Sequence, residues 1–233
     1  MDYEKIYAEH AERYDELVAA EDCDGNLLPA LEAIAMLRAR SVLEVGVGTG
    51  RITRLVAPIA RELIGVEREP AMLAVARRHL ASVRSCQLQL GVAEALPVAS
   101  AWADVAIAGW VFGHFRYWMP DAWREHVGRA LSEMKRALKP GGTLIVIETL
   151  GTGSSEPKPP SPELAEFYAW LASQHGFAQR AIRTDYAFPS VARAAEVTGF
   201  FFGADFARRV ESERWTRIPE CTGLWWQTLA KSE

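Results

Sequence analysis

Three glycines that alternate with other residues, together with a nearby carboxylate, form the most informative stretch of this sequence. Gly46, Gly48 and Gly50 directly follow the apolar run Val42–Val45, which only Glu44 interrupts. Glycine adopts positive φ angles at little cost and lets the backbone approach a ligand closely. The first N–H groups of a helix that begins after such a turn face the same ligand. The stretch therefore predicts a strand, a tight turn and a helix that together bind a cofactor, as in open α/β folds.

The register of this turn argues against a dinucleotide. The dinucleotide fingerprint has the form G-x-G-x-x-G and places a pyrophosphate at the helix N-terminus. Here the form is E-x-G-x-G-x-G, with Glu44 two residues before the first glycine. A carboxylate at that point repels a pyrophosphate and attracts an ammonium or a sulfonium group. The alternative is a purely structural turn beside a solvated glutamate.

This register resembles the first motif of the class I S-adenosylmethionine-dependent methyltransferases, which has the form E/D-x-G-x-G-x-G. The resemblance covers residues 40–150 well and the rest of the chain loosely. It implies that Glu44 lies near the methionine end of S-adenosylmethionine, directly or through water. It also implies that Gly46, Gly48 and Gly50 shape the turn around that cofactor.

A second carboxylate lies where a residue that binds a ribose is expected. Glu67 ends the apolar run that begins at Glu62, and it lies 21 residues after Gly46. Rossmann-like folds place an acid at about this interval, and a carboxylate can accept hydrogen bonds from two hydroxyl groups. The resemblance further implies that Arg68 and Met72 pack on the adenine ring. For Met72, a purely structural role in the core is the alternative.

The segment Val92–Pro97 resembles the G-D-A-E-x-L-P segment of the same family, which borders the adenine. Ala93 and Glu94 are therefore expected at the cofactor. Val92 departs from the pattern, because the family usually has an aspartate there that accepts a hydrogen bond from the adenine amino group. That hydrogen bond must be lost, supplied by Glu94, or made to the backbone.

His114 is the candidate catalytic residue. It follows the apolar run Ala103–Trp110, at a position where the resembled family often has polar groups that face the methyl-transfer site. If the acceptor is a hydroxyl group, a general base is useful, and His114 is preferred over Glu148, Asp185 and Tyr186. A histidine that only packs among aromatic rings is the alternative.

The elements that must position these residues alternate along the chain. Apolar runs predict strands at 41–45, 62–67, 86–91, 103–110 and 143–147, and helical patterns lie between them, the clearest at 121–138. Such alternation predicts an α/β fold with a mostly parallel sheet. The resemblance implies seven strands, helices on both faces and an antiparallel last strand, with closing strands at 200–210 and 221–229. Trp225 and Trp226 must then face opposite sides of the sheet.

We expect a single methyltransferase domain over residues 1–233. The resemblance implies that a helical segment, about 1–38, covers the cofactor through Tyr7 and Tyr14-Asp15. After the fifth strand, the Gly-, Ser- and Pro-rich stretch 151–162 predicts an exposed loop. Residues of about 151–188 are expected to form an insertion that caps the active site and selects the substrate. A dimer contact is the alternative for this insertion.

Composition restricts the partners and the compartment. The chain has 233 residues and a formal net charge of −4, which argues against nucleic acid as its main partner. Its three cysteines are far apart and lack C-x-x-C spacing, which favours a reducing compartment without a zinc or other metal site. No apolar run is long enough to span a membrane, and no leader pattern is present. A cytoplasmic protein is expected.

The sequence thus predicts transfer of a methyl group from S-adenosylmethionine to a small-molecule acceptor by in-line displacement, with S-adenosylhomocysteine as the product. Two other functions stay open: a Rossmann-type NAD(P)-dependent oxidoreductase, and a protein that binds S-adenosylmethionine without catalysis. The acceptor, the atom that receives the methyl group and the oligomeric state are equally open.

Overall fold

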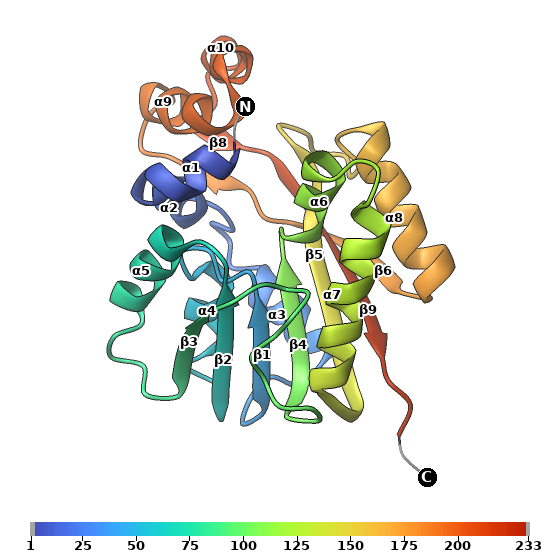
Figure 1. The fold of residues 1–233 in the computed structure, drawn as a ribbon. Helices are drawn as coiled ribbons and strands as arrows, with labels where there is room; N and C mark the ends of the chain where they lie inside the picture. Colours follow the sequence, from blue (N-terminus) through green and yellow to red (C-terminus); the bar gives the residue numbers. More distant parts are fainter. Residues whose placement is uncertain (1–2, 232–233) are drawn as a thin grey trace.

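The computed structural model describes residues 3–231, which form a seven-stranded sheet with helices on both faces (Figure 1). The order across the sheet is β3-β2-β1-β4-β5-β9-β6. The strands of this sheet are β1 (Ser41–Val45), β2 (Glu62–Glu67), β3 (Cys86–Leu90), β4 (Ala103–Gly109), β5 (Leu138–Thr152), β6 (Ala178–Arg183) and β9 (Glu220–Thr228). The first five strands pair in parallel, whereas β9 runs antiparallel to both β5 and β6. The predicted seven-stranded arrangement with an antiparallel last strand is therefore confirmed.

Helices precede, connect and follow these strands. They are α1 (Tyr3–Glu9), α2 (Ala11–Ala19), α3 (Leu27–Ile34), α4 (Arg51–Val56), α5 (Pro70–His79), α6 (Phe112–Trp118), α7 (Trp123–Ala137), α8 (Pro162–His175), α9 (Val191–Phe202) and α10 (Ala204–Ser212). Two short strands, β7 (Tyr186–Ala187) and β8 (Arg217–Ile218), pair outside the main sheet.

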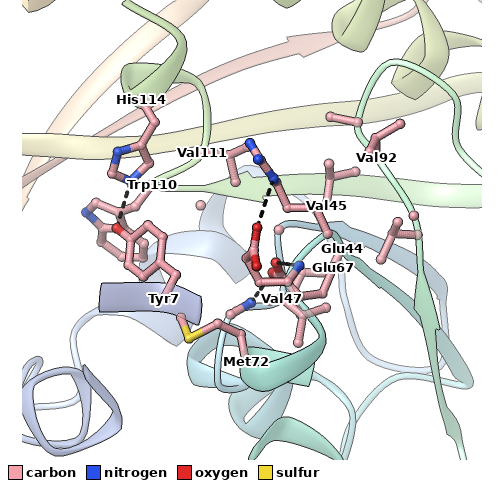
Figure 2. A pocket seen from close by; sticks show the side chains of 18 of the residues that line it. Tyr7, Glu44, Val45, Val47, Glu67, Met72, Val92, Trp110, Val111 and His114 are labelled. Carbon is pink, nitrogen blue, oxygen red and sulfur yellow. Dashed lines mark hydrogen bonds and ion pairs between the residues drawn. The ribbon is translucent and has the colours of Figure 1, made fainter. Parts of the chain in front are cut away.

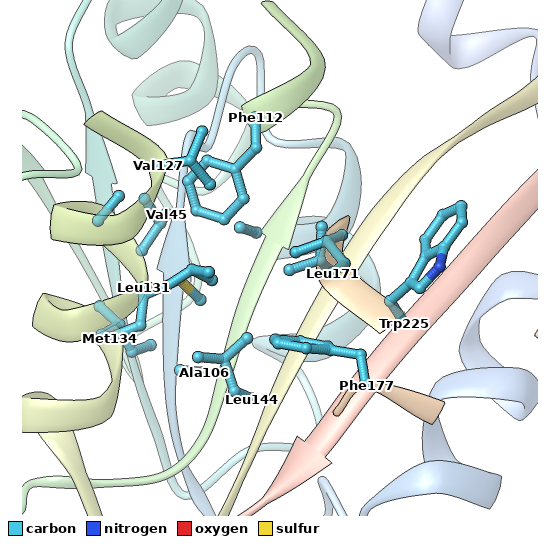
Figure 3. Close-up of a cluster of buried hydrophobic side chains, with 14 of the residues drawn as sticks. Val45, Ala106, Phe112, Val127, Leu131, Met134, Leu144, Leu171, Phe177 and Trp225 are labelled. Atoms are coloured by element: carbon cyan, nitrogen blue, oxygen red, sulfur yellow. The ribbon is translucent and has the colours of Figure 1, made fainter. Parts of the chain in front are cut away.

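Alternation along the central strands builds a separate apolar core on each face of the sheet. On one face Val45 and Leu144 pack with the apolar sides of α7 and α8 (Figure 3). On the other face Val42 and Ile145 pack with α3 and α4. Neighbouring residues of a strand point to opposite faces of the sheet. Glu44 of β1 accordingly lies on the face covered by α4, and Glu148 of β5 lies on the face covered by α6.

The last strand shows the same alternation. Trp225 is buried in the first core and stacks on Tyr168, with ring centroids 4.5 Å apart. Trp226 packs against the core on the opposite face. The prediction that the two tryptophans face opposite sides is confirmed.

The closing strand pair differs from the sequence expectation. The segment 200–210, predicted as a strand, is helical and belongs to α9 and α10, so that prediction is wrong. The partner of β9 at the sheet edge is instead β6, which is mostly exposed and therefore lacks an alternating apolar pattern. Gly199 lies inside α9, which continues through it. A Cβ atom at Gly199 would lie 2.8 Å from Ala207 Cβ, so glycine here permits close packing of α9 on α10.

The segment 151–188, for which a cap is expected, contains α8, β6 and β7. Within this range α8 packs on the first core and β6 forms the edge of the main sheet. The elements that lie above the carboxyl ends of the parallel strands are α1, α2 and α9, at the top of Figure 1. Among residues 3–231, no helix is both long and apolar enough to cross a membrane.

Candidate active site

A cavity of about 330 Å³ lies at the carboxyl ends of β1, β2 and β4 (Figure 2). Open α/β sheets bind ligands at this position, where the connections from adjacent strands diverge. All but one of the sequence-predicted cofactor residues line it, together with His114. The lining residues among them are Glu44, Gly46, Gly48, Glu67, Arg68, Met72, Ala93 and Glu94.

The glycine turn has the backbone that its sequence predicts. Gly46, Gly48 and Gly50 have φ angles of 74°, 58° and 96°, in the region that favours glycine. A Cβ atom at Gly46 would lie 2.2 Å from Val111 Cγ2, so only glycine fits this close approach to the loop after β4. Gly50 is the predicted residue that does not line the cavity. It precedes α4, and its nearest neighbours are Ala76 and Leu80 of the α5 region.

Glu44 is a buried acid without a basic partner. Its side chain is 1% exposed, lines the cavity, and accepts one hydrogen bond of 2.7 Å from the Thr53 hydroxyl. Burial raises the pKa of Glu44 to about 8, with a further contribution from the nearby Glu67 charge. A buried carboxyl of this kind is stabilised in its ionised form by a positively charged ligand. The Glu44 carboxyl therefore fits the ammonium group of S-adenosylmethionine.

Glu67 connects the end of β2 to the glycine turn. Its Oε2 accepts a 2.7 Å hydrogen bond from the Gly48 N–H, and its Oε1 accepts a 2.8 Å bond from the Glu69 N–H. Burial raises the pKa of Glu67, against these two bonds. Each carboxylate oxygen can accept a further hydrogen bond. Glu67 can therefore hold two ribose hydroxyls while it also fixes the turn.

The side of the cavity where the adenine is expected is lined by Met72, Val92, Ala93 and Glu94. Met72 both lines the cavity and packs against the α1–α2 segment. Glu94 Oε1 lies 3.0 Å from His126 Nδ1. Val92 lines the cavity with 47% of its surface exposed, on the opposite side from His114 in Figure 2.

His114 lies on α6 and meets the N-terminal segment across the cavity. Its Nε2 is 3.0 Å from the Tyr7 hydroxyl, and its ring stacks on Trp118 with centroids 4.8 Å apart (Figure 2). Burial, followed by the Arg68 charge, lowers the pKa of His114 to about 4. The imidazole is therefore neutral at pH 7 and weakly basic.

The other three candidate bases do not line the cavity. Glu148 accepts hydrogen bonds from backbone N–H groups at the start of α6. Asp185 is held by two arginines, Arg183 and Arg217. Tyr186 belongs to a separate apolar cluster beneath α9. These contacts make all three poor candidates for direct proton transfer with an acceptor in this cavity.

Two residues that the sequence did not single out also line the cavity. The Arg51 guanidinium lies 3.5 Å from the Trp110 ring centroid and pairs with Glu21 at 2.5 Å. Trp110 has a φ of 55°, which is strained for a residue with a side chain. Their positions in the sequence could have indicated them, because Arg51 directly follows the third glycine and Trp110 directly follows β4.

Residues of the N-terminal helices line one side of the cavity. Tyr7 and Tyr14 both line it, and their rings meet edge to face at 5.2 Å. Glu4 of α1 pairs with Arg68 at the cavity rim. In the described part of the chain, no group of three or more His, Cys, Asp or Glu side chains is arranged to hold a metal ion.

Comparison with known proteins adds a family assignment. Residues 43–146 match the family model described as a methyltransferase domain. A malonyl-(acyl-carrier protein) O-methyltransferase of Methylococcus capsulatus is 31% identical over 135 residues, which cover 56% of this chain and 45% of that protein. A demethylmenaquinone methyltransferase of Symbiobacterium thermophilum is 36% identical over 114 residues, which cover 46% of this chain and 41% of that protein. The matched region thus spans less than half the length of these relatives.

A solved structure extends the similarity to almost the whole fold. A methyltransferase from Aquifex aeolicus, described as dependent on S-adenosylmethionine, superposes with a TM-score of 0.54. The superposition covers 97% of this chain and 93% of that one, with 14% sequence identity. At this identity the comparison establishes the shared fold.

Proposed function

The chain belongs, through residues 43–146, to the class I S-adenosylmethionine-dependent methyltransferase family, and we propose that it transfers a methyl group from this cofactor to a small-molecule acceptor. The observation that carries the proposal is Glu44, a buried acid that faces the cavity without a basic partner. A cationic cofactor supplies the missing partner. A dinucleotide would instead bring a pyrophosphate toward Glu44 and Glu67.

S-adenosylmethionine supplies a methyl group on a positively charged sulfur, which leaves as a neutral thioether when a nucleophile attacks the carbon. The chain then mainly has to hold two molecules in line. Proximity and orientation can lower such a barrier by roughly 7–11 kcal/mol. Glu44 would hold the ammonium group, Glu67 the ribose hydroxyls, and the α1–α2 segment would exclude water from the cavity.

The acceptor end is proposed to lie between Tyr7, Trp110 and His114. These side chains line the cavity on the side away from Val92 and the expected adenine position. His114 is neutral there, and it would orient an acceptor hydroxyl or accept its proton through the pair that it forms with Tyr7. The relatives are named for two acceptors, malonyl-(acyl-carrier protein) and demethylmenaquinone. A small molecule, and not a nucleic acid, is our proposed acceptor for this chain.

Two other functions are less well supported. An NAD(P)-dependent oxidoreductase would require a pyrophosphate close to Glu44, which the charge distribution disfavours. A protein that binds the cofactor without catalysis keeps the same turn, and only turnover distinguishes it. Cys23, Cys86 and Cys221 are free thiols, which suits the cytoplasmic location that we propose.

Calorimetric titration of the ligand-stripped protein with S-adenosylhomocysteine, and separately with NADH, tests the cofactor. We expect micromolar binding of the first and none of the second. Binding of NADH alone would overturn the proposal. With the cofactor established, release of S-adenosylhomocysteine in a screen of small hydroxylated, amine and carboxylic acceptors distinguishes an enzyme from a protein that only binds.

A further inference from the structure

The short helix α6 carries side chains to the acceptor end of the cavity. His114 and Trp118 line the cavity, and Phe112 of the same helix is buried in the first core. Phe115 belongs to that core and also lines the cavity. The helix has only seven residues, and no side chain of the preceding residue Val111 caps it. The first N–H groups of a helix have no partner within the helix. A helix this short, buried and uncapped needs an anchor from elsewhere.

Glu148 of β5 provides that anchor. Its Oε1 accepts hydrogen bonds of 2.9 Å from both the Phe112 N–H and the Gly113 N–H. The side chain is 4% exposed and lies outside the cavity lining. A buried carboxyl is costly unless its hydrogen bonds are satisfied, and the groups that satisfy this one belong to the start of a single helix.

Gly113 is shaped to receive this carboxyl. A Cβ atom at Gly113 would lie 2.8 Å from Glu148 Oε2 and 3.2 Å from Leu164 Cδ2. An alanine there would have to displace the carboxyl or shift the helix. By contrast, Gly128 of α7 has no atom within 4 Å of its would-be Cβ. The absence of a side chain at Gly113 is therefore part of the anchor.

We propose that Glu148 is a positioning residue, which fixes the start of α6 and through it the orientation of His114 and Trp118 at the acceptor end. The proposal rests on the proposed function for its catalytic consequence. Glu148 does not touch the cavity, so it acts only through these two side chains. Misplacement of a catalytic group by about 1 Å can reduce a rate by roughly 100-fold.

Histidine NMR of the full chain tests the anchor without any acceptor. The imidazole of His114 stacks on Trp118, so its proton shifts report the orientation of that pair. The chain has five histidines, and His114→Ala identifies the signal. Glu148→Ala should move the His114 signal, whereas Glu148→Gln, whose amide oxygen can accept both N–H bonds, should retain it.

Gly113→Ala is the second variant, should Glu148→Ala fail to fold. It should also move the His114 signal, and the matched control Gly128→Ala should leave it in place. An unchanged His114 signal in folded Glu148→Ala or Gly113→Ala would overturn the anchor, whatever the activity.

Kinetics then test the catalytic consequence. With an acceptor from the screen, Glu148→Ala should lower kcat at least about tenfold and change S-adenosylhomocysteine affinity by less than about twofold. Equal losses in Glu148→Gln and Glu148→Ala would overturn the positioning role. Absence of methyl transfer in the unaltered protein would instead count against the proposed function, and the NMR result would stand.

Discussion

At the scale of single residues, the buried acid Glu44 couples cofactor binding to protonation. Burial raises its pKa to about 8, so the ligand-free protein holds a proton there at pH 7. An ammonium group beside Glu44 favours the ionised form. Binding should therefore release up to about one proton, and affinity should rise with pH between about 6 and 8 by up to tenfold per unit.

Calorimetry in two buffers of different ionisation enthalpy measures that proton release. We expect S-adenosylhomocysteine binding at pH 7 to show a buffer-dependent enthalpy, which Glu44→Gln abolishes while it weakens affinity. Glu32→Gln, at an exposed position of α3, serves as the matched control and should behave like the unaltered protein. A buffer-independent enthalpy in the unaltered protein would contradict the assigned role.

His114 leads to a prediction about the pH dependence of turnover. Its pKa is lowered to about 4 by burial and by the Arg68 charge. The imidazole therefore stays neutral from pH 6 to 8, and the rate should show no acid limb near the ordinary histidine pKa of about 6.5. His114→Ala should lower kcat with little effect on S-adenosylhomocysteine affinity. An acid limb near pH 6.5 that disappears in His114→Asn would contradict the burial-shifted state.

At the scale of elements, the N-terminal helices α1 and α2 contact the rest of the fold through apolar and aromatic side chains and through charged pairs. Glu4 pairs with Arg68, Glu16 with Arg193, and both pairs are substantially exposed. Exposed pairs contribute about 0–1 kcal/mol and weaken with salt. The partly buried Tyr7–His114 hydrogen bond is the better-shielded contact across the cavity.

Tyr7→Phe should therefore loosen this cover. Loss of one hydrogen bond of about 1 kcal/mol predicts roughly fivefold faster dissociation of S-adenosylhomocysteine, since the ligand leaves when the cover opens. Stopped-flow tryptophan fluorescence measures the rate. The control is Tyr117→Phe, which removes a hydroxyl from an exposed tyrosine bonded to Ser161. Equal rates in both variants would show that the Tyr7 hydroxyl does not hold the cover.

The elements around the cofactor turn could be predicted because their local signals agree with their environment. The strand at 62–67 is apolar until it reaches its terminal acid, and its bounds match β2. The edge strand β6 could not be predicted, since it is mostly exposed and carries no buried alternation. The segment 200–210 misled because phenylalanines favour strands, whereas here they pack between α9, α10 and the N-terminal helices.

The residues of the site likewise fall into those that the sequence could predict and those that it could not. Glu44 and Glu67 follow glycine and strand patterns that are local in sequence, so their places at the cavity were predictable. The contact between Tyr7 and His114 joins residues 107 positions apart, and the bonds from Glu148 to α6 span 35 and 36 positions. Such contacts depend on how the N-terminal helices and β5 pack, and no local pattern encodes them.

At the scale of the whole molecule, buried carboxyls should make the ligand-free protein less stable as pH rises. Burial raises the pKa of Glu44, Glu148 and Glu220 to about 8 in each case. The unfolded chain loses these protons near pH 4.5, whereas the folded chain keeps them until about pH 8. The folded state thus binds more protons in this window, and each such group reduces stability by up to about 1.4 kcal/mol per pH unit.

The lowered pKa of His114 has the opposite effect, but only below about pH 6.5, where the unfolded imidazole takes up a proton. Thermal unfolding between pH 6.5 and 8.5 therefore reports mainly on the carboxyls. We expect the melting temperature to fall by several degrees over this range. Glu44→Gln should make the decline shallower because it removes one of these buried carboxyls, and Glu32→Gln should not. A melting temperature that stays constant or rises would mean that these acids are already ionised in the folded protein.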